Sequence, residues 1–244
     1  MSRGADALFA GHVGLRAVID AVLEGHLGHV TADGDAARLS LGCYEIFGGD
    51  PSSPGARDLL AGAGRPRELV YGNDPSWRRL ILEVHGGQVA HRPMLDFDAA
   101  GLDRAHLRQM ERELPAKVVL RPMDLALSAQ LDAELEPHAL QVFASPADFV
   151  ARGSGVAALS NGTLACAATS YAVSSRFVEV AIATRTAFRG LGLAAAASAA
   201  FMGRCLDEGR VPRWSASNPV SQRLAVRLGF RPAGVCEVLY LRAA

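Results

Sequence analysis

The chain has 244 residues, half of them hydrophobic, and its 25 basic and 25 acidic residues give a formal net charge of zero. This length allows one large domain or two modest ones with a sizeable core, and the balanced charge does not indicate a nucleic-acid-binding face. The four cysteines lack C-x-x-C spacing, which argues against a zinc or redox motif. No histidine pair has the spacing of metal ligands, so we expect no metal.

The sequence also gives no sign of a membrane or secretory protein. No apolar run reaches the roughly 20 residues that a membrane-spanning helix requires. The N-terminus lacks a charged segment followed by an apolar stretch and a cleavage site, the pattern of a signal peptide. We therefore expect a cytoplasmic protein with no membrane partner and with reduced cysteines.

The first 115 residues predict a small α+β unit. Apolar positions over residues 5–24 have helical spacing, and Asp33-Gly34 predicts the turn of a hairpin. Asn73 to Ser76 offer an N-cap and an early proline for a helix. In chain order we expect a helix over 5–24, strands over 29–32 and 37–41, a loop over 48–56, a strand over 68–71, a helix over 77–84, a strand over 89–95 and a helix over 103–114.

Three aspartates in this unit form a candidate carboxylate cluster: Asp96, Asp98 and Asp103. Their spacing does not fit a calcium-binding loop, so we interpret them as a solvated turn. No other residue of the unit has a catalytic signature.

The chain after Pro115 predicts a larger α+β unit. Asn161-Gly162 marks the tip of a hairpin, and Ser145-Pro146 marks the start of a short helix. In chain order we expect a strand over 117–122, a helix over 123–135, a short helix from Ser145, strands over 155–159, 163–168 and 177–183, a helix over 193–208, a strand over 213–217, a helix over 219–228 and a strand over 235–241. The expected division is therefore residues 1–115 and residues 116–244, with a mixed sheet flanked by helices in the second part.

A strand, a glycine loop and a helix follow one another over residues 178–208, and this is the most informative stretch. Small residues let backbone N–H groups approach an anion, and the next helix adds unpaired N–H groups and the positive end of its dipole. The combination is typical of a phosphate or pyrophosphate site. Arg189 offers a charge-assisted hydrogen bond from the side.

Two classes of phosphate-binding loop fit this stretch poorly. A P-loop needs G-x-x-x-x-G-K-[ST], and the loop contains no lysine. Residues 190–195 match the dinucleotide pattern G-x-G-x-x-A, but only about 50 residues follow, too few for the further parallel crossovers of that fold.

The loop Arg189-Gly190-Leu191-Gly192-Leu193-Ala194 resembles the [QR]-x-x-G-x-[GA] signature of the GNAT superfamily of acetyltransferases. A second block, residues 214–218 followed by Leu224 to Phe230, resembles the family's strand, asparagine, helix and Gly-Phe segment. The segments around Trp77 and Phe149 are also similar to a two-domain GNAT group that includes a zwittermicin A resistance acetyltransferase. The resemblance implies a GNAT-like fold for residues 116–244.

The resemblance also implies acetyl-CoA as the donor cosubstrate. Backbone N–H groups of the loop would hold the pyrophosphate, and the strand before it would bond the pantetheine amides. A backbone N–H on that strand would polarise the acetyl carbonyl. The residues assigned to the cofactor are Ile182, Thr184, Arg189, Gly190, Leu191, Gly192, Leu193, Ala194, Asn218 and Ser221.

The proton chemistry is less determined by the sequence. Glu179 interrupts an apolar strand, so it either faces solvent or acts as the general base; Tyr171 and Ser217 are the alternatives. Many GNAT enzymes carry a tyrosine as general acid where this chain has Ala225, which leaves that role vacant.

The resulting hypothesis is an N-acetyltransferase in which the amine of a small molecule, such as an antibiotic or an amino-metabolite, attacks acetyl-CoA directly. The alternative is an acyl-CoA sensor or degenerate acetyltransferase that binds the cofactor without turnover. Residues 1–115 would shape the acceptor side or mediate dimerisation, so a homodimer is an open alternative.

Overall fold

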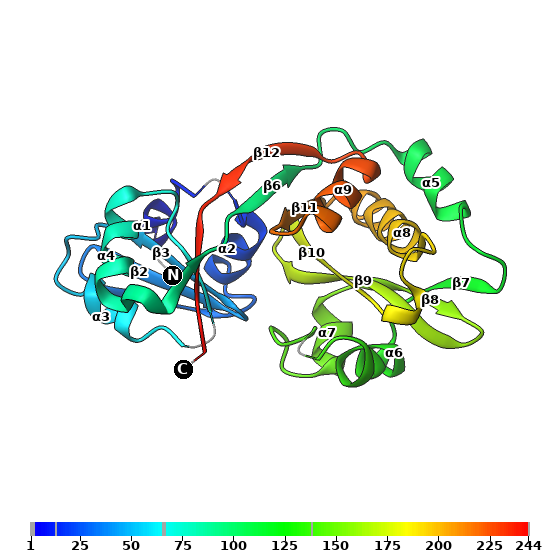
Figure 1. The fold of residues 1–244 in the computed structure, drawn as a ribbon, viewed down its shortest axis with the longest axis horizontal. Helices are drawn as coiled ribbons and strands as arrows, with labels where there is room; N and C mark the ends of the chain where they lie inside the picture. Colours follow the sequence, from blue (N-terminus) through cyan, green and yellow to red (C-terminus); the bar gives the residue numbers. More distant parts are fainter. Residues whose placement is uncertain (1–2, 13, 65–66, 138, 244) are drawn as a thin grey trace.

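The computed structural model describes residues 3–12, 14–64, 67–137 and 139–243. It has an α+β architecture of two mixed sheets, each flanked by helices and placed side by side (Figure 1). The α+β class expected from the sequence is confirmed. No helix in these ranges is long and apolar enough to cross a membrane.

The first sheet has six strands in the order β1-β2-β3-β4-β13-β5. Its strands are β1 (His29–Asp33), β2 (Ala36–Leu41), β3 (Tyr44–Gly49), β4 (Arg67–Val70), β5 (Val89–His91) and β13 (Val238–Leu241). Its helices are α1 (Arg3–Leu8), α2 (Arg16–Leu23), α3 (Ala56–Ala61), α4 (Pro75–His85) and the short η1 (Gly86–Gln88).

The second sheet has seven strands in the order β12-β6-β11-β10-β9-β8-β7. Its strands are β6 (Met94–Asp98), β7 (Val118–Pro122), β8 (Gly155–Ser160), β9 (Thr163–Val173), β10 (Phe177–Thr184), β11 (Val211–Ala216) and β12 (Arg231–Cys236). Its helices are α5 (Arg104–Arg112), α6 (Leu125–Gln130), the π-helical η2 (Leu131–Leu135), α7 (Pro146–Arg152), η3 (Thr186–Phe188), α8 (Leu193–Asp207) and α9 (Pro219–Leu228).

Local sequence signals explain several element boundaries. Asp74 caps α4 by accepting a hydrogen bond from the Ser76 backbone N–H at 2.7 Å, with proline in the first turn. Asn161 and Gly162 both have positive φ, as a two-residue hairpin turn requires. The expected hairpins therefore form.

The helix expected over residues 5–24 is wrong, because the chain forms α1 and α2 with a break between them. Leu15, before α2, has a positive φ of 58°. Gly14 lies against Cys236 of β12, where an added Cβ would stand 3.1 Å from the Cys236 Cβ. A tertiary contact therefore interrupts the helical pattern. Val13, an apolar position of that pattern, lies outside the described residues.

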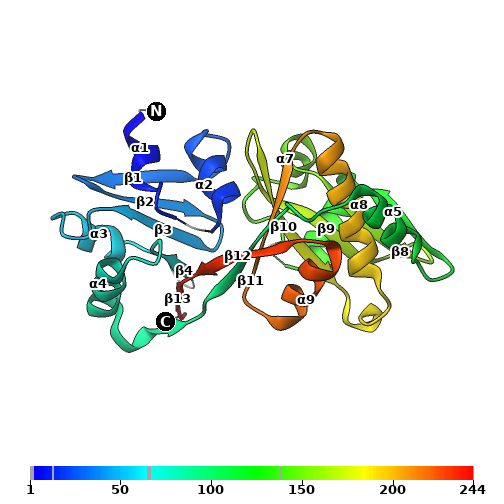
Figure 2. The ribbon, with the colours of Figure 1, turned by 90° about the horizontal axis from the view of Figure 1, so that it is seen from above.

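The two sheets exchange strands. β6 and α5 precede residue 116 but belong to the second sheet, whereas β13 lies at the C-terminal end and pairs with β4 and β5 in the first sheet. The single strand expected over 235–241 is wrong: β12 and β13 are separate and join different sheets. The division of the chain into two domains at residue 115 stays a proposal. Figure 2 shows β12 extending from the second sheet toward the first.

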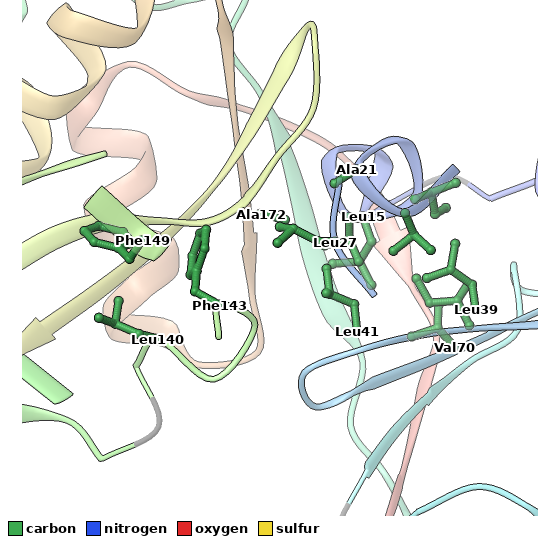
Figure 3. Packing of buried hydrophobic residues seen from close by; sticks show 14 of the residues in the cluster. Leu15, Ala21, Leu27, Leu39, Leu41, Val70, Leu140, Phe143, Phe149 and Ala172 are labelled. Carbon is green, nitrogen blue, oxygen red and sulfur yellow. The ribbon is translucent and has the colours of Figure 1, made fainter. Parts of the chain in front are cut away.

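One apolar cluster joins the two halves of the molecule. It combines Leu15, just before α2, and Leu41 of β2 with Ala172 of β9 and Phe149 of α7, all of them buried. Figure 3 shows these side chains along the boundary between the sheets. Because burial of a large apolar side chain contributes about 1.5–3 kcal/mol, this shared cluster favours a fixed arrangement of the two sheets.

Replacing Leu239 of β13 with alanine should lower the free energy of unfolding by about 2–5 kcal/mol. Leu239 is 2% exposed and packs in a cluster with Tyr71 and Trp77. Chemical denaturation followed by tryptophan fluorescence measures the loss. Leu82→Ala on α4, where the leucine is 36% exposed, is the matched control; an equal loss there would contradict the assigned role of β13.

Candidate active site

Strand β10 separates from its neighbour β11 just before the glycine loop. The parallel register of these strands ends at the pair Glu179–Arg213, whereas β10 stays paired with β9 as far as Thr184. From Trp214 onward β11 is paired only with β6, which lies along its opposite edge. Backbone groups of β10 beyond Glu179 therefore face a gap on this side, and such groups need other partners.

A β-bulge in β9 accompanies this separation. The register of β9 passes from Ala172 to Ser170 between consecutive residues of β10, so Tyr171 is the extra residue. The Tyr171 hydroxyl accepts a hydrogen bond from the Cys43 backbone N–H at 3.1 Å and donates to the Leu41 carbonyl at 3.4 Å. The bulge therefore ties the second sheet to the β2–β3 turn.

The glycine loop forms the positive end of helix α8. Gly190 and Gly192 have φ of 78° and 80°, values that favour glycine. The N–H groups of the first turn after Gly192 have no acceptor within the helix. Arg189 is held beside them, with its Nε donating to the Thr184 carbonyl at 3.3 Å.

The strand gap and the loop open into one cavity of about 920 Å³. Nine of the ten residues assigned to the cofactor line it: Ile182, Thr184, Arg189, Gly190, Gly192, Leu193, Ala194, Asn218 and Ser221. Leu191, the tenth, does not line the cavity and its side chain is 50% exposed. The two sequence motifs, separated along the chain, therefore meet at one site.

Asn218 and Ser221 have structural partners in addition to their place at the cavity. The Asn218 side chain caps α9 by accepting a hydrogen bond from the Ser221 backbone N–H at 2.8 Å. The Ser221 hydroxyl accepts from Trp214 Nε1 at 3.0 Å. The amide nitrogen of Asn218 is therefore the atom of this side chain that suits a ligand acceptor.

Sequence reasoning missed several residues that line this cavity: Glu134, Glu136, Val220, Leu224 and Arg227. The last three share a face of α9 with Ser221, so helical spacing would have indicated them. Nothing in the sequence placed η2 there, where Glu134 pairs with Arg185 of the loop at 3.4 Å.

Glu179 is buried at the point where β10 and β11 separate. It is 4% exposed, and its Oε2 has no hydrogen-bond partner among the described residues. Burial, with the negative charge of Asp96 as the next contribution, raises the pKa of Glu179 to about 8. The burial of Glu179 therefore excludes the alternative that its side chain faces solvent. With this pKa, the carboxyl group changes protonation slightly above neutral pH.

Asp96 corrects the interpretation of the aspartate cluster. It lies inside the second sheet on β6, opposite Ser215, and is 1% exposed. Its carboxylate pairs with Arg213 at 2.5 Å, yet burial outweighs this pair and raises its pKa to about 6. The prediction of a solvated turn is wrong for Asp96, which belongs to the surroundings of Glu179.

The remaining candidates for proton transfer occupy different places. Burial raises the pKa of Tyr171 well above its ordinary range, which keeps its hydroxyl protonated. Ser217 is half-buried at the end of β11 and does not line the cavity. Ala225 is fully buried, so the side chain at this position points into the core.

Glu179→Gln should stabilise the fold increasingly as pH rises. The unfolded carboxyl ionises near its ordinary value of 4.5 and the folded one near 8. Between these values the native state binds more protons, so its stability falls as pH rises. The neutral amide lacks this dependence. Urea denaturation at pH 5 and pH 8 measures the effect, and an equal difference between variant and wild type at both pH values would contradict it.

The chain matches the family model described as GNAT acetyltransferase over residues 6–238. It is 24% identical over 213 residues to an uncharacterized N-acetyltransferase, YdfB, of Bacillus subtilis, covering 82% of this chain and 77% of that protein. A solved GCN5-related N-acetyltransferase-like protein from Streptococcus suis superposes with a TM-score of 0.85 and 28% identity, covering 93% and 94% of the two chains. A GCN5-related N-acetyltransferase from Kribbella flavida gives a TM-score of 0.65 at 16% identity, covering 95% and 97%, and shows the shared fold.

Proposed function

Since this chain belongs to the GNAT acetyltransferase family and is an N-acetyltransferase, we propose that its donor is acetyl-CoA and its acceptor is the amine of a small molecule. The observation that carries the proposal is the single cavity of about 920 Å³ shared by the separated strand β10 and the loop before α8. One part of this cavity suits an extended amide chain and the other suits a diphosphate.

The donor site follows from the groups that face the cavity. The first-turn N–H groups of α8 and the loop suit the diphosphate of CoA, and Arg189 adds a cation beside it. The pantetheine arm would extend β10 along Ile182 and Thr184, with amide hydrogen bonds replacing those of a strand. A backbone N–H of β10 would polarise the thioester carbonyl, and this group is already in place before the reaction.

The reaction forms a C–N bond between the amine and the acetyl carbon and breaks the C–S bond of the thioester. Glu179 would accept the proton that the amine loses, directly or through water. A pKa of about 8 suits this role, because a base is most effective when its pKa lies near the working pH. The CoA thiolate would then take a proton from water, since Ala225 offers no acid.

Direct attack by the amine is favoured over a covalent acyl-enzyme. Cys166 lies beside a residue of the proposed donor site, with its sulfur accepting from the Thr184 hydroxyl at 3.2 Å. Burial raises the pKa of this thiol to about 11, so the nucleophilic thiolate is scarce at neutral pH. The pKa of each of the other three cysteines is raised in the same way, to about 11 for Cys43 and about 12 for Cys205 and Cys236.

The acceptor would enter on the side of β10 that faces the first sheet. We propose that the small molecule carrying this amine is an antibiotic or an amino-metabolite. The similarity to the zwittermicin A resistance group remains part of this proposal. Trp77 and Phe149, which carry that similarity, are both buried: Trp77 Nε1 donates to the Gly49 carbonyl at 3.1 Å, and Phe149 stacks edge-on against Phe143.

Release of free thiol from acetyl-CoA in the presence of a panel of amines tests the proposal. We expect amine-dependent release, with the acetylated amine detected by mass spectrometry. Tight CoA binding without turnover on any amine would instead favour the acyl-CoA sensor. Absence of CoA binding would contradict both.

A further inference from the structure

Four polar side chains gather on one face of the second sheet, where β10, β11 and β6 meet. Arg213 and Ser215 alternate along β11 and therefore point to the same side. The strand register places Glu179 of β10 opposite Arg213, and Asp96 of β6 opposite Ser215. The residues that alternate with these four pack in the apolar cluster around α8, on the other face: Val178, Phe97 and Trp214. The four polar groups therefore face away from α8.

The charges of this cluster leave a negative excess. Arg213 pairs with Asp96 at 2.5 Å, and Glu179 is a second buried carboxylate beside them. Asp98, half-buried further along β6, adds a weaker negative charge near Asp96. One oxygen of Asp96 and one of Glu179 have no hydrogen-bond partner among the described residues. Because a buried charge is costly unless it is neutralised, uptake of one proton by the two carboxylates relieves the excess.

The other titratable groups near Glu179 are neutral. Burial raises the pKa of each of them, to about 12 for the thiol and well above the ordinary range for the two phenols: Tyr44 of β3, Tyr171 of β9 and Cys236 of β12. The buried residues of α2, which packs against β10, are all apolar, and Arg16 and Asp20 of this helix pair with each other at 2.5 Å. The charges that act on Glu179 are therefore mainly those of Asp96 and Arg213.

Ser215 connects the cluster to the donor cavity. The parallel pairing of β10 with β11 ends at Glu179 and Arg213, and Ser215, two residues further along β11, lines the cavity that opens there. Glu179 lines neither this cavity nor a neighbouring one of about 200 Å³, to which Ala181 and Ala183 contribute. The proposed base therefore needs an intermediary to reach an amine in the donor cavity, and Ser215 occupies the required position.

The Ser215 hydroxyl acts on both carboxyl groups. Burial is the main cause of the raised pKa of Asp96 and of Glu179, and the Ser215 hydroxyl opposes it in each. Its oxygen has no hydrogen-bond partner of normal geometry among the described residues, so its proton is not committed to another group of the fold. A hydroxyl can donate one proton while it accepts another, which is what a relay requires.

We propose that Ser215 passes the proton of the amine to Glu179, and that Asp96 is a positioning residue whose negative charge draws the proton to this carboxylate. The inference rests on the proposed function and deepens it. As the C–N bond forms, the amine gives a proton to Ser215 Oγ while the hydroxyl proton moves to Glu179, so the serine is unchanged. After the products leave, the Glu179 carboxyl returns the proton through the same hydroxyl to solvent in the cavity.

Replacement of Ser215 tests the relay. Ser215→Ala should lower kcat for acetyl transfer about tenfold or more, because Glu179 loses its link with the cavity, and Ser215→Thr should restore most of the rate because it keeps the hydroxyl. Ser198→Ala is the matched control, since Ser198 is a buried hydroxyl without a partner among the described residues and lies outside the donor cavity. Equal kcat for Ser215→Ala and Ser198→Ala, or for Ser215→Ala and Ser215→Thr, would overturn the relay.

Replacement of Asp96 tests the positioning role. Asp96→Asn keeps an acceptor for Arg213 but removes the charge, so Glu179 should lose its proton more readily. We expect the rise of rate with pH to occur at a proton concentration about tenfold higher than in wild type, the effect of one nearby like charge, with KM for acetyl-CoA unchanged. A merely structural role would lower the rate at every pH without moving the profile, and that result would overturn the assignment.

A titration without substrates separates this inference from the proposed function. Carboxyl-carbon NMR of protein labelled with carbon-13 glutamate follows the ionisation of Glu179, whose signal is identified by its absence in Glu179→Gln. The midpoint should move to lower pH in Asp96→Asn and to higher pH in Ser215→Ala, which loses a donor to the carboxylate. Midpoints that stay in place or move in the opposite directions would overturn the inference even if acetyl transfer is observed. The expected midpoints without acetylation of any amine would support the arrangement of the cluster and contradict the proposed function.

Discussion

Replacing Gly192 with glutamate is expected to raise the Kd for acetyl-CoA roughly 100-fold or more, which corresponds to about 2.7 kcal/mol. Gly192 precedes α8 with φ of 80°, and the nearest atom to an added Cβ is the Glu113 carbonyl oxygen, 4.0 Å away. The new side chain therefore has space, but its carboxylate would stand where the diphosphate is proposed to bind. Calorimetric titration with CoA measures the change.

Two controls separate charge from strain in this experiment. Gly192→Ala keeps the site neutral and imposes only the backbone strain of a positive φ, about 1 kcal/mol. Gly203→Glu adds the same charge to the same helix at an open position away from the donor cavity. Undiminished CoA binding by Gly192→Glu would show that the loop does not hold the phosphates.

Glu179→Gln is expected to lower kcat by roughly 10²–10⁴-fold, the usual contribution of a general base. The wild-type rate should rise with pH and level off above about 8, where the Glu179 carboxyl has lost its proton. The variant should lack this rise, while KM for acetyl-CoA stays unchanged. Initial rates of thiol release from pH 6 to 9.5 measure both effects.

Glu68→Gln provides the matched control for this variant. Glu68 is also a buried carboxylate, 9% exposed, but it pairs with Arg92 in the first sheet and lines none of the cavities described above. Its replacement should leave the pH–rate profile unchanged. If the Glu179→Gln enzyme retains the wild-type pH–rate profile, Glu179 is not the general base. Water held by other groups would then accept the proton.

The proposed donor site is built from local parts, each of which has a signal in the sequence. A glycine with positive φ, a helix N-terminus and an asparagine cap each depend on a few neighbouring residues, so Gly190, Gly192 and Asn218 could be identified from short motifs. The structure adds that these motifs meet in one cavity. The separation of β10 from β11 depends on pairing between distant strands, and no short pattern encodes it.

The parts that sequence reasoning missed depend on distant partners. β3 was not expected, because Glu45 stands in a strand that is otherwise buried, and its burial requires Arg38 and Arg67 from neighbouring strands. The sequence around Asp96 is typical of a turn, whereas its burial results from the pairing of β11 and β12 on either side of β6. In both cases a charged residue is buried only because a cation from another strand compensates it.

The position of β13 has a consequence for the order in which the protein folds during synthesis. β4 and β5 have no direct pairing with each other, and β13 lies between them. A ribosome therefore releases β4 long before it makes the strand that covers its edge. Exposed strand edges favour aggregation, and contacts between distant residues form slowly. The nascent chain would thus carry an open edge until β13 has been synthesised, which makes this strand decisive for the first sheet.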